Sequence, residues 1–279
     1  MPRDATSPQI LRGSLFGLAW IAILTQACFF AIPLLLVLWL SLQGAPDQPA
    51  TVTLMAWFSV LGSVEARAAL LNSLLLAALT ALVTTLLAAP LAYLIAVRRR
   101  FLGRLALAFV IMMWFFDPGL RILGWMQAFK DLALIDFMPM GLLGGFSAEL
   151  IASIHAWLPL AVLCLAMGFE RVDRAVLDAA RECGATAFVL LRRMLWPLNR
   201  RLAIVILAIV YCGSVGSFLE PRLLGSGDFE QASEWLQRAL ESETGWPYAA
   251  VMLLLMLLLA CLPLFVVLPA WRRGQETRP

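Results

Sequence analysis

Few residues of this 279-residue chain could carry out catalytic chemistry. Lys130 is the only lysine, and no GxxxxGKS/T motif surrounds it, so the chain lacks the phosphate-binding loop of that class of ATPase. The five cysteines and the single histidine, His155, show no spacing typical of a zinc site. We therefore expect no catalytic residue, no metal ligand and no cofactor in this chain.

Four other residues could contact a charged solute inside a membrane. Asp117 and Arg121 lie four residues apart in a largely apolar stretch, close to Trp114, and Glu220 follows another apolar stretch. A charge at the centre of a bilayer costs about 2.5–3.5 kcal/mol on insertion scales, so these residues are candidates for a substrate path. The structural alternative is that Asp117 pairs with Arg121, and Glu220 with Arg222. The sequence leaves both alternatives open.

The composition places these charges in an integral membrane protein. Hydrophobic residues make up 62% of the chain and charged residues 14%, whereas soluble domains are only about half apolar. A helix needs about 20 apolar residues to cross a bilayer. Six stretches reach or approach that length, at about 15–42, 68–97, 105–129, 149–170, 201–220 and 245–271. We expect an all-α domain of six transmembrane helices over residues 15–271, with a leader at 1–14 and a tail at 272–279.

One of the six stretches contains charges and a proline, and two segments outside the stretches are also expected to be ordered. The third stretch is long enough only if it includes Asp117 and Arg121, and Pro118-Gly119 should kink or break its helix. Outside the predicted spans, we expect residues 54–61 to lie along the membrane surface and residues 231–240 to be partly helical.

Arginine placement predicts the orientation of the spans. Most of the 21 basic residues fall in the leader, in the turn that contains Arg98–Arg100 and Arg104, in the loop 171–200 with its flanking Arg201, and in the tail. Acidic residues gather in the alternate loops. Because positive charge accumulates on the cytoplasmic side, both termini and the loop 171–200 should be cytoplasmic. The net charge of +3 reflects this bias and does not indicate nucleic-acid binding.

The loop between the fourth and fifth spans predicts two short helices and a break. Asp173 can cap a first helix through Cys183, with Val176, Leu177, Ala180 and Cys183 on one apolar face. Gly184 should end that helix in a left-handed conformation, and Thr186 should cap the second. We expect Phe188, Leu191 and Leu195 to share one side of the second helix, Arg192-Arg193 to lie on another, and Pro197 to end it.

This loop resembles the EAA loop of ABC-importer permeases. The resemblance is carried by Asp178-Ala179-Ala180, Gly184 and Pro197, whose order and spacing match. Asp178 replaces the usual glutamate, and Met194 and Trp196 replace the usual isoleucine and leucine. The resemblance implies that residues 171–200, here called the coupling loop, dock onto a cytoplasmic ATPase. It assigns ATPase coupling to Asp178, Ala179, Ala180, Gly184, Ala185, Arg192 and Pro197.

Other stretches are similar to the spermidine/putrescine branch of these permeases. They are Leu71-Asn72-Ser73, the segment 89–93, His155 with Leu158-Pro159, and the segment 217–225. The resemblance covers about residues 15–271 and implies a polyamine-like solute. Relatives of this branch carry opines, amino acids, other zwitterions or ferric iron, so these remain alternatives.

The same resemblance implies the partners. They are a second permease, two copies of an ATPase that bind ATP and Mg²⁺, an external binding protein and the lipid of a bacterial inner membrane. A membrane enzyme would need a polar constellation on one side of the membrane, and a secondary transporter would show inverted repeats. The sequence displays neither feature.

Overall fold

The computed structural model describes residues 8–44, 52–97, 100–131, 145–225, 229–242, 245–263 and 265. Among these residues, the only β pairing is an isolated bridge between Gln43 and Val52. The expected all-α class is therefore confirmed. The elements are α1 (Pro8–Ser41), α2 (Met55–Gly62), α3 (Val64–Ala96), α4 (Arg100–Phe115), α5 (Pro118–Asp131), α7 (Phe146–Glu170), α8 (Arg174–Glu182), α9 (Ala187–Leu190), a π-helical turn (Leu191–Leu195), α10 (Trp196–Leu198), α11 (Arg200–Val215), α12 (Leu219–Leu224), α13 (Ala232–Glu241) and α14 (Trp246–Ala260).

Helix α3 is central to the bundle and packs against α7 and α11. Its buried side is built from small residues, of which Ala77, Ala81, Ala88 and Ala92 are 0% exposed. Steps of four and seven residues return to one face of a helix. Small side chains on that face let neighbouring helices approach closely within a bilayer. The many alanines of this segment therefore act as packing residues.

Helices α7 and α11 also approach each other closely at two glycines. Gly213 of α11 lies against the indole ring of Trp157 in α7, where an added Cβ would collide with the ring. Gly168, near the other end of α7, lies equally close to the side chains of Leu202 and Asn199. Both glycines allow a helix separation that a larger residue would prevent.

The candidate membrane spans differ from one another in form. Trp20–Ser41, Val64–Ala96 and Phe146–Glu170 are continuous helices long and apolar enough to cross a bilayer. Two helix pairs pass the same test only when joined across a bend, and Trp246–Ala260 is a shorter apolar helix. Residues 264 and 266–271 of the predicted last span lie outside the described residues. The count of six spans therefore stays a prediction.

The predicted third span is broken, as Pro118-Gly119 indicated. Helix α4 ends at Phe115 and α5 begins at Pro118, with a bend of 100° between them. The Oδ1 atom of Asp117 accepts a hydrogen bond from the backbone N–H of Leu120 at 3.1 Å, so Asp117 caps α5.

The helix of the predicted fifth span, 201–220, ends earlier than expected. Helix α11 stops at Val215, and the chain forms a separate short helix, α12, from Leu219. Gly216 follows the last residue of α11, with φ −87° and ψ 7°.

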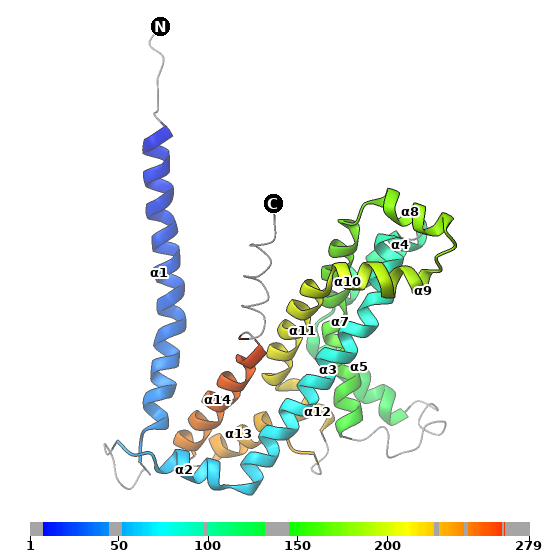
Figure 1. Cartoon of the computed structure of the whole chain (residues 1–279). Helices are drawn as coiled ribbons and strands as arrows, with labels where there is room; N and C mark the ends of the chain where they lie inside the picture. The colour runs from blue at the N-terminus through cyan, green and yellow to red at the C-terminus, as the bar shows by residue number, and fades with distance from the viewer. Residues whose placement is uncertain are drawn as a thin grey trace.

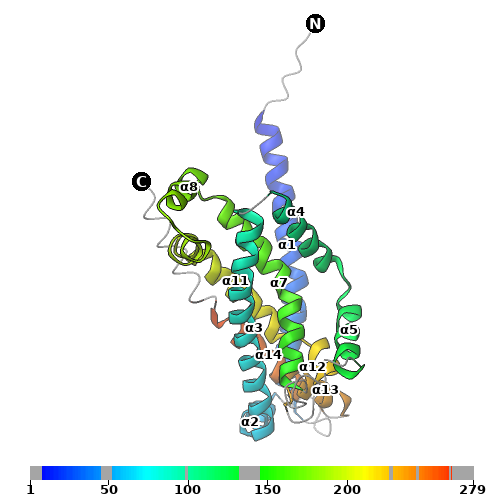
Figure 2. The ribbon, with the colours of Figure 1, turned by 90° about the vertical axis from the view of Figure 1, so that its right-hand side faces the viewer.

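The short helices gather at the two ends of the molecule (Figure 1). Helices α8, α9 and α10 lie at one end, the end at which α1 begins, whereas α2, α12 and α13 lie at the other. A quarter turn of the molecule shows the same separation, with α8 at the top and α2 and α13 at the bottom (Figure 2). Residues 54–61 and 231–240 are largely helical, in α2 and α13.

Helix α1 stands at the edge of the bundle, with its closest contacts to α14 (Figure 1). None of the most hydrophobic part of its span is buried within this chain. Large apolar side chains such as Phe29 and Leu35 are 75% and 62% exposed. Lipid or another membrane protein must cover such a surface.

Candidate functional site

The coupling loop folds into the predicted pair of short helices. The Oδ1 atom of Asp173 accepts a hydrogen bond from the N–H of Ala175 at 2.9 Å and caps α8. Thr186 caps α9 through a 3.4 Å bond that its Oγ1 accepts from the N–H of Val189. Gly184 lies between these helices with φ +82°, the left-handed conformation expected of it. These local predictions are confirmed.

Two backbone hydrogen bonds fasten the end of α8. The N–H of Gly184 donates to the carbonyl of Arg181 at 2.8 Å, and the N–H of Ala185 donates to the carbonyl of Ala180 at 3.0 Å. They satisfy carbonyls that a helix end would otherwise leave unpaired. The turn therefore holds α8 and α9 in one defined arrangement.

Three leucines attach the coupling loop to the bundle. Leu177, Leu190 and Leu195 are at most 3% exposed and belong to the hydrophobic core formed by α3, α7 and α11. Of the predicted apolar face of α8, Leu177 is buried and Ala180 partly buried. Val176 and Cys183 are exposed, so only part of the predicted apolar face is covered by the bundle. Helix α8 meets the bundle along a narrow line, which leaves its flanking apolar residues uncovered.

The second helix differs more from its prediction. Phe188 was expected beside Leu191 and Leu195, but its side chain is 66% exposed. The π-helical turn at Leu191–Leu195 has more residues per turn than an α-helix, so Phe188 no longer shares the buried face of Leu195. The result is an exposed aromatic ring on a helix that is anchored by its neighbours.

Pro197 does not end the second helix. Helix α10 continues through Leu198, and the chain turns by 79° at Asn199 before α11. Pro197 directly follows the π-helical turn and Trp196, one residue before the helical segment Ala187–Leu198 ends. The side-chain amide of Asn199 donates to the carbonyl of Leu195 at 2.9 Å and stabilises the turn.

Asp178 and Arg181 connect α8 to the end of α3. Arg181 forms an ion pair with Asp178, with 2.7 Å between Nη1 and Oδ1, and donates from Nη2 to the carbonyl of Val97 at 3.3 Å. A hydrogen bond with Tyr93 contributes most to raising the pKa of Arg181, and the bond to Asp178 adds to it. A positive charge also suits the negative end of the α3 dipole. Arg181 is thus a link that the motif alone did not reveal.

The remaining predicted coupling residues lie on the same loop. Ala179 and Arg192 are exposed, whereas Ala180 and Ala185 are partly buried and pack against the core. Ala180 and Ala185 thus lie on the side of the coupling loop that meets the bundle, and Ala179 and Arg192 face away from it.

The four substrate-path candidates are less closely grouped. Asp117 is exposed and caps α5, and no ion pair joins it to Arg121 in the described part of the chain. Arg121 lines a largely apolar cavity of about 420 Å³ between α4, α5 and α7. Trp114 is 48% exposed and is not among the residues that line this cavity. Glu220, on α12, accepts a hydrogen bond from Ser217.

His155 lies on the wall of the cavity that contains Arg121. Its Nδ1 atom accepts a hydrogen bond from Nε1 of Trp125 at 3.0 Å, and the two rings meet edge to face. His155 is thus held against α5 by one hydrogen bond and one ring contact, both with Trp125.

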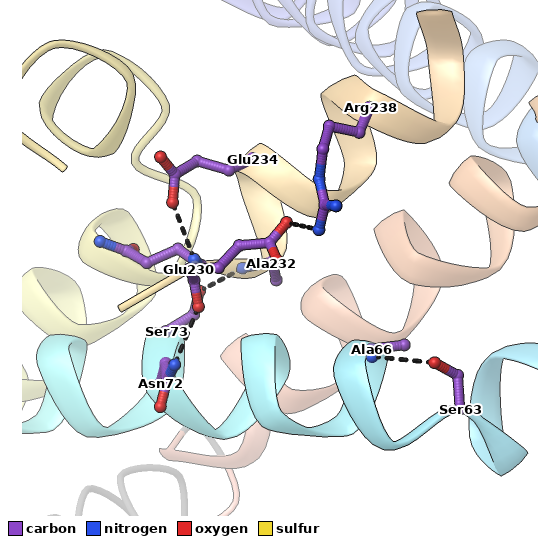
Figure 3. A network of polar contacts seen from close by, with 9 residues as sticks. Ser63, Ala66, Asn72, Ser73, Glu230, Ala232, Glu234 and Arg238 are labelled. Carbon is purple, nitrogen blue, oxygen red and sulfur yellow. Dashed lines mark hydrogen bonds and ion pairs between the residues drawn. The ribbon is translucent and has the colours of Figure 1, made fainter. Parts of the chain in front are cut away.

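A polar network holds α13 against α3 (Figure 3), at the end of the bundle opposite the coupling loop (Figure 1). Asn72 donates from Nδ2 to the carbonyl of Glu230, and Oγ of Ser73 accepts from the N–H of Ala232, both at 2.9 Å. Glu230 is paired with Arg238. Figure 3 shows the two side chains of α3 pointing toward the start of α13.

Residues at this same end form a capping box that sequence reasoning overlooked. The N–H of Gln231 donates to the Glu234 carboxylate at 2.9 Å, and the Gln231 side chain donates to Glu149 of α7. Glu149 is fully buried. Burial chiefly raises the pKa of Glu234. The sequence carried little sign of this capping box, because glutamine is not among the preferred N-cap residues, and nothing local indicated contact with Glu149.

No cluster of three potential metal-ligating side chains occurs within the described ranges. The described structure has an anchored coupling loop at one end and the α13 network at the other.

Comparison with known proteins agrees with this arrangement. Residues 59–270 match the family described as "Binding-protein-dependent transport system inner membrane component". The chain is 24% identical over 250 residues to the spermidine/putrescine transport system permease protein PotB of Haemophilus influenzae, covering 85% of this chain and 87% of that protein.

Two solved structures share the fold. A chain from a bacterial ABC transporter that imports the acidic polysaccharide alginate has a TM-score of 0.73 and 15% identity, over 97% of this chain and 98% of that one. A chain of a bacterial alginate transporter in complex with its pentasaccharide-bound periplasmic protein has a TM-score of 0.77 and 14% identity, over 99% and 100%. The chain thus belongs to the family of binding-protein-dependent inner-membrane transport components, the permease subunits of ABC importers.

Proposed function

We propose that the coupling loop of this permease is the surface held by a cytoplasmic ATPase. The observation that carries the proposal is that this one loop has both apolar residues buried in the bundle and apolar residues exposed on its surface. Leu177, Leu190 and Leu195 are buried in the bundle, whereas Val176 and Phe188 are 49% and 66% exposed. An exposed aromatic side chain on a rigid support is a common anchor of protein–protein binding.

The connections of the coupling loop suggest how ATP hydrolysis moves the membrane domain. The loop joins α7 to α11, and Arg181 ties it to the end of α3 at Val97. These are the three helices that pack together in the bundle. Closure of two ATPases, each with bound ATP and Mg²⁺, would displace the loop and therefore all three helices together.

The proposed complex contains a second permease, two ATPase subunits and an external binding protein. The uncovered sides of α1 and α4 leave surface for the second permease and for lipid. The proposed cargo is a small solute. The PotB relative supports a polyamine-like cation, and opines, amino acids, other zwitterions and ferric iron remain alternatives. Asp117, Arg121, Trp114 and Glu220 are the proposed contacts of this chain with the cargo.

We further propose that both termini and the coupling loop face the cytoplasm. The arginine distribution supports this orientation. In a variant without native cysteines, a cysteine at Gln48 or Gly227 should react with an impermeant reagent added from outside. A cysteine at Ala187 should not react, and the reverse pattern would overturn the orientation.

Truncation of the exposed phenylalanine tests ATPase docking. Phe188→Ala should weaken ATPase binding to the reconstituted permease pair by roughly tenfold, because a buried aromatic anchor contributes on the order of 1–2 kcal/mol or more. Phe58→Ala is a matched control, since Phe58 is 74% exposed on α2 at the opposite end. Equal affinity of both variants and the wild type would contradict docking through this loop.

A further inference from the structure

The cavity of about 420 Å³ between α4, α5 and α7, here called the α4–α5 cavity, lies beside the break between α4 and α5 and is lined in part by Phe116 of that break. Figure 2 shows α4 and α5 following one another along one side of α7, and both helices pack against it. Non-helical backbone at membrane depth occurs only where it is buried in protein or lines a water-filled cavity. Phe115 and Phe116 are 83% and 54% exposed, so this chain does not bury the break. The break must therefore line a water-filled space or meet another subunit.

Arg121 is the one charged residue among the described residues that line the α4–α5 cavity. Its guanidinium group has no ion pair or side-chain hydrogen bond with a described residue. Asp117, one helical turn earlier, caps α5 through its Oδ1 atom and does not line the cavity. An unpaired charge in an apolar setting inside a membrane is costly. An anion bound in this cavity would therefore be strongly stabilised.

His155 can add a hydrogen bond to the same anion. Its Nδ1 atom accepts from Nε1 of Trp125 at 3.0 Å, so Nδ1 is unprotonated and the proton of the neutral imidazole lies on Nε2. His155 and Arg121 line one cavity, and both offer it N–H donors. No carboxylate occurs among the described lining residues. The side chains therefore suit carboxylate oxygens and do not suit an ammonium group.

The rest of the α4–α5 cavity suits the carbon skeleton of a small solute. Phe109 and Trp125 contribute aromatic rings, and Met112 and Met113 contribute flexible thioethers that adapt to irregular shapes. Gly124 leaves part of the wall open, because no atom lies within 4 Å of the place where its Cβ would stand. The volume falls in the range of about 300–1,000 Å³ that is typical of small-molecule sites.

We propose that the α4–α5 cavity binds a carboxylate group of the cargo, with Arg121 and His155 as donors. The proposal rests on the proposed function as an importer subunit and narrows its cargo. It favours amino acids, opines and other zwitterions over a polyamine, whose charged groups are all ammonium groups. A lipid in the cavity would leave the backbone at the break without water, so the need to hydrate that backbone favours a solute.

The test uses the complete importer complex in phosphatidylcholine nanodiscs and two photoreactive probes of the same shape. They are 4-benzoylbenzoate, which carries a carboxylate, and its neutral amide, 4-benzoylbenzamide. Illuminated benzophenones insert into nearby C–H bonds, and Met112 and Met113 on the cavity wall are suitable targets. Mass spectrometry of peptides from α4 measures the labelling. Size-exclusion chromatography selects assembled complex for every variant, and ATP hydrolysis by the wild-type complex tests the proposed function independently of the probes.

Arg121→Gln should reduce labelling by the carboxylate probe roughly tenfold, equivalent to about 1.4 kcal/mol, and leave labelling by the amide unchanged. Arg67→Gln is the matched control, because it makes the same charge change at an exposed position of α3 that does not line the cavity. Gly124→Leu fills the cavity without a collision at Cβ, so it should abolish labelling by both probes. Gly62→Leu, at an equally open position on α2, should not.

Equal carboxylate labelling of the wild type and Arg121→Gln would overturn the proposal. Loss of labelling when phosphatidylglycerol is added to the nanodiscs would overturn it in favour of a lipid, and absence of carboxylate labelling in the wild type would overturn it in favour of a neutralising group from the second permease. Mass spectrometry of the solute that copurifies with the binding protein should find a carboxylate. A solute with ammonium groups alone would overturn the inferred cargo and leave the proposed importer function intact.

Discussion

Replacing Gly184 by alanine isolates the contribution of one backbone conformation to ATPase coupling. Gly184 has φ +82°, and no other atom lies within 4 Å of the place where a Cβ would stand. The substitution therefore introduces no collision with a neighbour, and its cost is conformational. A residue with a Cβ pays about 1–2 kcal/mol in the left-handed region. Such a cost reduces the population of the docking-ready loop by a factor of roughly 5–30.

The assay is the affinity of the purified ATPase for the permease pair in nanodiscs, with substrate-stimulated ATP hydrolysis as a second readout. Gly62→Ala is the matched control, because Gly62 also has open space around it but lacks a positive φ. Gly184→Asn should lie between wild type and alanine, since asparagine tolerates the left-handed conformation. Wild-type affinity in Gly184→Ala would show that this conformation does not set the docking geometry.

Three further predictions concern Arg181, Asp117 and Glu234. Arg181→Gln should reduce uptake more than ATPase affinity, because it removes the ion pair with Asp178 and weakens the link to α3; equal losses in the two assays would contradict transmission through that link. Asp117→Asn keeps an N-cap and removes a charge, so uptake should fall if Asp117 lies in the substrate path, with thermal stability unchanged. Asp117→Ala should lower stability by about 0.5–2 kcal/mol, and wild-type uptake in the asparagine variant would limit Asp117 to capping. Burial raises the pKa of Glu234 above its usual 4.5, so the folded state binds this proton more tightly than the unfolded state. The resulting contribution of Glu234 to folding stability is present at lower pH and is lost as the pH rises. Glu234→Gln keeps the capping box, so the Tm of the wild type, relative to that of this variant, should fall as the pH rises above 4.5. Parallel Tm profiles of the two proteins would contradict the argument.

Several features were readable from the sequence because they depend on residues within one helical turn. The caps at Asp173 and Thr186, the left-handed Gly184 and the break at Pro118 are all of this kind. A hydrogen bond between neighbours in the chain, or the absence of a proline N–H, has the same effect in almost any fold. The length and apolarity of the long helices likewise predicted a membrane protein, because the bilayer thickness is a constant.

Other features were decided by the tertiary structure. Leu177 is buried and the adjacent Val176 is exposed, because only the side of α8 that carries Leu177 meets the bundle. Arg181 reaches Val97 across 84 residues of sequence, and Gln231 reaches Glu149 across 82. Such contacts depend on which faces of α3, α7 and α11 meet, and nearly uniform alanine and leucine sequences do not encode that choice locally. The sequence alone thus determined the family, the class of fold and the position of the coupling loop, while the packing of the helices decided which residues anchor that loop and which remain exposed for a partner.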